Sequence, residues 1–216
     1  MQKEIYFFGP DGSGKTTLAR MLVRFLTSKG MPVRVSWMRG THTLASLIAR
    51  FLAKFNTFHG DDNPYFMIRI PRKMLRLWYF LEFVSILPIV IQRFIIPSLM
   101  GFFVIAERCL VDFIVWLIIT TKNIKALNSL CIKPILYYLL KTARNHTFVY
   151  ITADIQTLMV RSNESYRSLL MQVALYNVLG KYIGACVVNT TNKNINESLR
   201  DLVRCVHIRV AKRYLE

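Results

Sequence analysis

The chain has 216 residues, of which 53% are hydrophobic and 19% are charged, so it can bury a core and lacks the composition of a disordered protein. This length predicts one domain spanning residues 1–216. The four cysteines form no C-x-x-C pair, which argues against a zinc site and predicts reduced, mostly buried thiols at Cys109, Cys131, Cys186 and Cys205. The first residues lack the basic and apolar regions of a secretory signal, so we expect a cytoplasmic protein.

The first predicted elements are an apolar strand at residues 3–8 and an amphipathic helix at 15–29, joined by a glycine-rich loop. Residues 9–16 match the phosphate-binding pattern G-x-x-x-x-G-K-[ST] at every fixed position. Glycines in this loop allow positive φ, so successive N–H groups can form an anion nest at the helix N-terminus. We expect the phosphates of ATP to bind here, cradled by Gly9, Pro10, Asp11, Gly12, Ser13, Gly14, Lys15, Thr16 and Thr17.

Two of these side chains have distinct expected roles. The Lys15 ammonium can reach the β and γ phosphates, and the Thr16 hydroxyl can ligate Mg²⁺. We therefore expect ATP and Mg²⁺ as the cofactors of the protein.

Further along the chain, apolar strands alternate with helical segments. Strands are expected at 32–37, 102–106, 147–151 and 185–189. Helices are expected at 42–54, 72–100 with a break near Pro88, 109–121, 124–143, 154–162, 167–182 and 195–214, and a loop at 56–64. Asn194 and Glu197 form the signature of a capping box at the last helix. The alternation predicts an α/β protein in which helices cover both faces of a parallel sheet.

Residues 77–106 and 109–121 are apolar enough to raise the question of a membrane span. Glu82, Arg93 and Asp112 interrupt them, and no uncharged run reaches the roughly eighteen residues that a span needs. We expect buried helices and a strand here, with weak membrane association left open.

The net charge of +17 suits an anionic ligand, although one nucleotide does not require so much charge. Two clusters of basic residues are expected to lie on faces exposed to solvent. Binding of RNA or acidic lipid by these clusters is the alternative that stays open. The clusters are Arg69, Arg72, Lys73 and Arg76, and Arg200, Arg204, Arg209, Lys212 and Arg213. We expect nucleotide substrates as partners and no specific nucleic acid, and a homodimer stays open.

Residues 102–108 form the second informative segment, because an apolar strand ends there in an acid and a base. Glu107 could hold Mg²⁺ through water, and Arg108 could bridge the donor and acceptor phosphates. A structural ion pair at a strand end is the alternative interpretation.

The segments named above resemble the thymidylate kinase family, and they do so in the family's order. Phe8 to Thr17 is similar to its loop, roughly G-x-D-G-[SA]-G-K-[ST]-[ST]. Pro97 to Gly101, followed by Val104 to Arg108, is similar to P-x-L-x-x-G leading into V-[IV]-x-D-R-[YF]. Later segments resemble the strand and lid arginine, the tyrosine-bearing helix and the last strand of the family: Phe148 to Ile151 with Arg161, Leu175-Tyr176, and Val187 to Thr191.

The resemblance implies the three-layer P-loop NTPase fold, with helices on both faces of a five-stranded parallel sheet. It also implies transfer of a γ-phosphoryl group from ATP to a nucleoside monophosphate, most directly dTMP to dTDP. Lys15, Arg108 and Arg161 would be catalytic, with Arg161 and Arg167 closing over the phosphates from a short lid at 161–167. Asp11 would face the acceptor sugar, while Arg39 and Arg108 would bind the acceptor phosphate. Thr16 and Glu107 would hold the Mg²⁺ ion.

The chain also departs from the family pattern. Glutamate replaces aspartate at Glu107, and Cys109 replaces the aromatic residue. The Asp-Arg pair whose arginine reads thymine in the family falls on Ser85 and Ile86, and an apolar side chain cannot supply that hydrogen bond. The preferred acceptor therefore stays open.

Two other functions remain as alternatives. One is a kinase on the same scaffold that phosphorylates a nucleoside or a phosphorylated metabolite. The other is a nucleotide-binding protein without kinase activity that docks on membrane or RNA.

Overall fold

The computed structural model describes residues 4–213, with side chains up to residue 206, and confirms the α/β class. Five parallel strands form one sheet in the order β2-β4-β1-β5-β6. Their bounds are β1 Glu4–Phe8, β2 Val33–Ser36, β4 Phe103–Ala106, β5 Thr147–Thr152 and β6 Cys186–Asn189. All five predicted strands are therefore present, each within one or two residues of its expected bounds.

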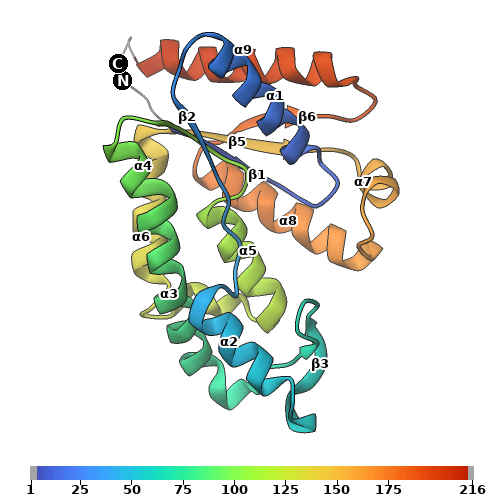
Figure 1. The fold of residues 1–216 in the computed structure, drawn as a ribbon. Coiled ribbons are helices and arrows are strands. Elements are labelled where there is room, and N and C mark those ends of the chain that lie inside the picture. The colour runs from blue at the N-terminus through green and yellow to red at the C-terminus, as the bar shows by residue number, and fades with distance from the viewer. Residues whose placement is uncertain (1–3, 214–216) are drawn as a thin grey trace.

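Helices cover both faces of the sheet, as Figure 1 shows. On one face lie α1 (Lys15–Ser28) and α9 (Ile195–Arg213); on the other lie α5 (Leu110–Thr121), α6 (Lys133–Asn145) and α8 (Tyr166–Tyr182). Side chains of β1 alternate between these layers: Ile5 and Phe7 pack with α1 and α9, whereas Tyr6 and Phe8 face the other layer. Both faces are buried, which explains why β1 is apolar almost throughout.

A peripheral part extends beyond the sheet at the bottom of Figure 1. It contains α2 (Thr43–Leu52), a short strand β3 (His59–Asn63) and the start of α3 (Leu75–Val90). The 56–64 segment, predicted as a loop, thus contains a strand, which two isolated bridges to Ile68 hold in place. The 3₁₀ turns of this region are Asn56–Phe58 and Arg72–Met74.

The predicted break at Pro88 is wrong, because α3 continues through it. A π-helical segment follows at Ile91–Ile95 and passes into α4 (Ile96–Leu99). The missing N–H of Pro88 is tolerated because the flanking residues Ile86 and Ile89 are buried in the core, which holds the helix in place.

The helix predicted at 124–143 begins later than expected. A 3₁₀ turn occupies Ile124–Asn128, where the Asn123 side chain accepts a hydrogen bond from the Lys125 N–H. Ser129 is extended, and α6 then starts at Lys133 with Pro134 in its first turn.

The other predicted helices are present as α1, α2, α5, α7 (Ile155–Arg161), α8 and α9, and the capping box of α9 is confirmed. Residue 214, the expected end of the last helix, and residue 3, the expected start of the first strand, lie outside the described residues.

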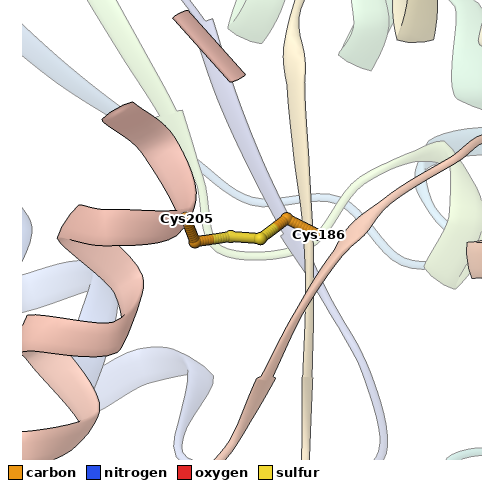
Figure 2. The surroundings of a disulfide bond; sticks show 2 residues. All are labelled: Cys186 and Cys205. Carbon is orange, nitrogen blue, oxygen red and sulfur yellow. A yellow bond between two sulfur atoms is a disulfide. The ribbon is translucent and has the colours of Figure 1, made fainter. Parts of the chain in front are cut away.

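Four reduced thiols were expected, and this is wrong for two of them. Cys186 on β6 and Cys205 on α9 form a disulfide, shown in Figure 2, with their Cα atoms 6.0 Å apart. Cys109 and Cys131 are free. The pairing depends on how α9 packs against β6, which the spacing of 19 residues does not reveal.

We expect reduction of this disulfide to lower the free energy of unfolding by about 3 kcal/mol, the entropy term for a loop of this size. Urea titrations with and without reductant measure the difference, and Cys131→Ser serves as the control. Thiol titration of the denatured, unreduced protein should count the two free cysteines. A count of all four would contradict the pairing.

Candidate functional site

The glycine-rich loop joins the carboxyl end of β1 to the N-terminus of α1. Gly9, Gly12 and Gly14 have φ values of 147°, 83° and 92°, so each of the three adopts the positive φ that the sequence predicts. A Cβ at Gly9 would lie 2.0 Å from the carbonyl oxygen of Ile151, so β5 leaves no room for a side chain there. The loop therefore has the backbone conformation that an anion nest requires.

Lys15 is buried and folds back over the loop. Its Nζ donates to the carbonyl oxygens of Gly9 and Pro10 at 2.7 and 2.5 Å, and it lies 3.3 Å from the Ser13 hydroxyl. Burial, reinforced by the nearby Arg108 guanidinium, lowers the pKa of Lys15 to about 7. The ammonium is thus held inside the loop by its own backbone carbonyls.

Thr16 and Glu107 are far apart in sequence but contact each other. The Thr16 hydroxyl at the start of α1 donates a hydrogen bond to the Glu107 carboxylate at the end of β4. Both are oxygen ligands of the kind that Mg²⁺ prefers. The donor chemistry of this pair therefore fits the predicted metal position.

Asp11 lies between two arginines that come from neighbouring strand ends. Arg39, just after β2, lies 3.2 Å from one of its oxygens, and Arg108, after β4, pairs with the other. Burial alone would raise the pKa of Asp11, but Arg108, Arg39 and Lys15 outweigh it and lower the pKa to about 2. Two guanidinium groups are therefore fixed side by side at the edge of the loop.

Asp112 is the second carboxylate near the Arg108 guanidinium. It is buried in the first turn of α5, 3.5 Å from the guanidinium. Its carboxylate accepts hydrogen bonds from the Tyr176 hydroxyl and the Cys109 N–H. Burial raises the pKa of Asp112, while Arg108 and Lys15 oppose that shift. These bonds hold the Asp112 carboxylate near Nη1 of Arg108, while Nη2 of Arg108 pairs with Asp11.

A cavity of about 500 Å³ opens over the loop and reaches α9. Its lining includes Asp11, Lys15, Thr16, Arg108 and Arg161, together with Thr190 and Lys193 from the β6–α9 connection. The volume lies within the usual range for a small-molecule site.

The predicted lid is a four-residue connection, residues 162–165, between α7 and α8. Arg161 ends α7, and its guanidinium donates to the Thr190 hydroxyl at 3.1 Å. Thr190 in turn contacts the Ser13 carbonyl at 3.1 Å. Arg167 is exposed on the first turn of α8. Of the two lid arginines, Arg161 therefore lies at the cavity.

The Arg39 guanidinium also stacks on two aromatic rings, 4.4 Å from the centroid of Trp116 and 5.5 Å from that of Tyr65. Its Nη1 donates to the Tyr65 hydroxyl at 2.6 Å. Trp116 comes so close that a Cβ at Gly40 would lie 1.9 Å from the indole. The position of Arg39 is therefore set by aromatic packing as well as by Asp11.

The loop that carries Arg39 is anchored by a buried carboxyl group on α3. Glu82 accepts hydrogen bonds from the Thr41 N–H and hydroxyl at 2.7 and 2.6 Å, and Trp116 Nε1 donates to the same hydroxyl at 3.0 Å. Burial raises the pKa of Glu82 to about 7, against the two Thr41 hydrogen bonds that lower it.

The structure thus brings together most residues that the sequence singled out: Asp11, Lys15, Thr16, Arg39, Glu107, Arg108 and Arg161 surround one site. Their roles stay predictions. Sequence reasoning did not single out Asp112 or Trp116 as site residues, although their spacing of four and eight residues from Arg108 indicates one helix face. No spacing pattern in the sequence pointed to Tyr65 as a site residue.

The positions aligned with the thymine-reading pair lie in the core. Ile86 is buried, and the Ser85 hydroxyl accepts a hydrogen bond from the Ala45 N–H. Of the other arginines of this region, Arg93 donates to the carbonyl of Trp37 at 2.6 Å, and Arg69 pairs with Asp62. Both guanidinium groups therefore have partners within the chain.

No family model and no curated protein sequence matches the chain. Among solved structures, it is similar to the thymidylate kinase of Ehrlichia chaffeensis, with a TM-score of 0.53 and 17% sequence identity over 94% of this chain and 97% of that chain. At this identity the similarity establishes the fold. The protein therefore has an α/β fold in which helices surround a five-stranded parallel sheet, arranged as in that thymidylate kinase.

We expect ATP affinity to fall as the pH rises above about 7, because the free Lys15 loses its proton there while bound phosphates favour the ammonium form. The dissociation constant should rise by up to about tenfold per pH unit. Calorimetry in two buffers of different ionisation enthalpy would detect the proton uptake. The ionisation of ATP itself affects the wild type and Lys15→Met equally, but the variant should lack the part of the pH dependence that comes from Lys15. Identical pH profiles for both proteins would contradict the assignment of this proton to Lys15.

Glu82 should make the protein less stable as the pH rises from 4.5 to about 7, because the folded state binds its proton more tightly than the unfolded state does. Its contribution is complete below pH 4.5 and should decline by about 3 kcal/mol in total across that window. Urea unfolding of the wild type and Glu82→Gln at pH 5 and pH 8 measures it. The variant should lack this decline; an equal decline in both would show that Glu82 is not its source.

Proposed function

We propose that the protein transfers the γ-phosphoryl group of ATP to a nucleoside monophosphate, with dTMP as the leading acceptor and dTDP as the product. One observation carries this proposal: Arg39 and Arg108 converge on Asp11 at the rim of the phosphate-binding loop. A protein that only bound ATP would need the phosphate-binding loop, but it would not need the two arginines Arg39 and Arg108 facing that loop. Two phosphate-binding centres side by side are what phosphoryl transfer between nucleotides requires.

The donor side fits ATP with Mg²⁺. The positive-φ glycines and the N-terminus of α1 would bind the β and γ phosphates, and Lys15 lies among them. The Thr16 hydroxyl and the Glu107 carboxylate would hold Mg²⁺, directly or through water. The ion neutralises charge on the phosphates when bound.

The acceptor side would use the arginine pair. An incoming monophosphate offers oxygen atoms that can replace or share the Asp11 carboxylate between Arg39 and Arg108. Asp11 would then be free to accept a hydrogen bond from the acceptor sugar. The stacking of Arg39 on Trp116 and Tyr65 would hold its guanidinium ready during this exchange.

Catalysis by these residues would be positioning and electrostatics. Lys15 and Arg108 would stabilise the charge that develops on the migrating group, and Arg161 would approach it from the lid. Glu82 and Asp112 touch no substrate in this scheme. They position the Arg39 loop and Arg108 through the hydrogen bonds described above.

A kinase with a different phosphorylated acceptor is the second candidate. The observation that favours it is the burial of Ser85 and Ile86, which leaves the base unread at those positions. The phosphate-binding half of the acceptor site would be unchanged in that case.

We expect Arg108→Ala to lower kcat by at least about a hundredfold while ATP affinity changes little, because its partners would be the migrating group and the acceptor phosphate. Glu107→Gln should instead raise the Mg²⁺ concentration needed for half-maximal rate. Steady-state kinetics and calorimetry with ATP separate these effects. Loss of ATP binding in Arg108→Ala together with wild-type behaviour of Glu107→Gln would reverse the two roles.

A screen of monophosphates tests the function itself. We expect turnover of dTMP with ATP and Mg²⁺, and kcat/KM for dUMP, dCMP and dAMP within about two orders of magnitude, because an apolar wall discriminates by only about 10 to 200-fold. A preference for dTMP above about 10⁴-fold would instead indicate an arginine that reads the base. If none of the four is phosphorylated, the nucleoside monophosphate assignment is wrong.

A further inference from the structure

The longest helical run of the molecule leaves an apolar side uncovered. Residues Arg72–Leu99 form 28 continuous helical residues with a mean hydropathy of 1.8 in their most apolar window, and only 39% of that window is buried. Exposed apolar side chains stand at Leu77, Phe80, Leu87 and Ile91, and their spacings of three, seven and four residues place them on one face.

The neighbouring helix α2 exposes a second set of apolar side chains. Ser85 ties α2 to α3 through its hydrogen bonds with Ala45 and Thr43. On the outer side of α2, Leu47 and Phe51 are 64% and 58% exposed. Because Ser85 and Glu82 turn a different side of α3 toward α2, we restrict the term apolar face to the exposed residues Leu77, Phe80, Leu87 and Ile91 of the helical run. These four side chains share one side of a helix, which distinguishes them from singly scattered exposed residues.

The charges around the apolar face are almost all positive. Between residues 63 and 153 the sequence has eleven Lys and Arg residues but only three acids, Glu82, Glu107 and Asp112. Glu82 and Asp112 are buried, and Glu107 is bonded to Thr16 at the cavity. Residues 63–153 therefore present cations and no free carboxylate, while Asp61 and Asp62 lie just before this stretch and Asp62 pairs with Arg69 and Lys122.

Several of these cations are placed where they would flank an inserted apolar surface. Lys73 and Arg76 are exposed at the start of the helical run. On α6, Lys133, Lys141 and Tyr137 are exposed. Helix α6 adjoins the run, because Tyr138 lines the same small cavity as Phe94. Apolar side chains bordered by lysine, arginine and tyrosine are typical of a helix face that lies in a membrane interface.

We propose that the apolar face docks the protein peripherally on an anionic lipid bilayer, with the apolar side chains among the acyl chains and the flanking cations on the headgroups. A second copy of the chain is a poorer fit, because each copy carries a net charge of +17 and the same basic border. The helical run lies on the bilayer and does not cross it, since Glu82 and Ser85 bind the α2 segment from its inner side. This inference is independent of phosphoryl transfer.

Cosedimentation of the full chain with vesicles tests the proposal. We expect binding to vesicles of phosphatidylcholine with about 30% phosphatidylglycerol, weak binding to pure phosphatidylcholine, and a marked fall between 0.05 and 0.5 M salt. Leu77→Gln combined with Leu87→Gln should lower the partition coefficient by about tenfold or more. Lys73→Gln combined with Arg76→Gln should lower it by about 30-fold, the effect of two surface cations.

Val178→Gln on α8 is the matched control, since Val178 is 67% exposed and lies outside the apolar face. ATP binding and the melting temperature of every variant report whether the fold is intact. Equal binding of the control and the Leu77/Leu87 variant would overturn the proposal, as would absence of binding to anionic vesicles. Light scattering tests the alternative that the apolar face binds a second copy of the chain. A wild-type protein that does not bind vesicles but forms a stable dimer, and a Leu77/Leu87 variant that is monomeric, would assign the face to a second copy.

Discussion

The arrangement of the site depends on one carboxylate, that of Asp11, held between Arg39 and Arg108. The contact requires three strand ends to lie next to one another, and the sheet order β2-β4-β1 places them so. Because the strands are parallel, their carboxyl ends meet at one edge, where ligands of open α/β sheets bind. The fold therefore explains why residues separated by nearly a hundred positions form one charged cluster.

That cluster buries many ionisable groups, and each needs a partner. Lys15 has backbone carbonyls, Arg108 has Asp11 and Asp112, and Arg39 has Asp11 and two aromatic rings. Burying charges costs free energy unless such pairing compensates for it. A preorganised set of cations around a cavity is nevertheless what stabilises a migrating phosphoryl group. We therefore interpret the costly burial of these charges as functional.

The sequence predicted the sheet and the loop well because both follow local rules. The glycine spacing of residues 9–16 and the apolar strands need no knowledge of distant contacts. The Cys186–Cys205 pair, the Arg39–Trp116 stacking and the Glu82–Thr41 hydrogen bonds depend on how separate helices pack, so no local pattern reveals them. The helix through Pro88 shows the same limit, since tertiary packing overrides the local preference of proline.

The most direct test of the account is the affinity of a bisubstrate analogue, adenosine and deoxythymidine joined through five phosphates. If Lys15 and the Arg39–Arg108 pair bind donor and acceptor phosphates at adjacent centres, the analogue should bind at least about a hundredfold more tightly than ATP. Arg39→Ala should remove that gain and leave ATP affinity unchanged. An analogue that binds no more tightly than ATP would contradict the existence of an acceptor site next to the loop.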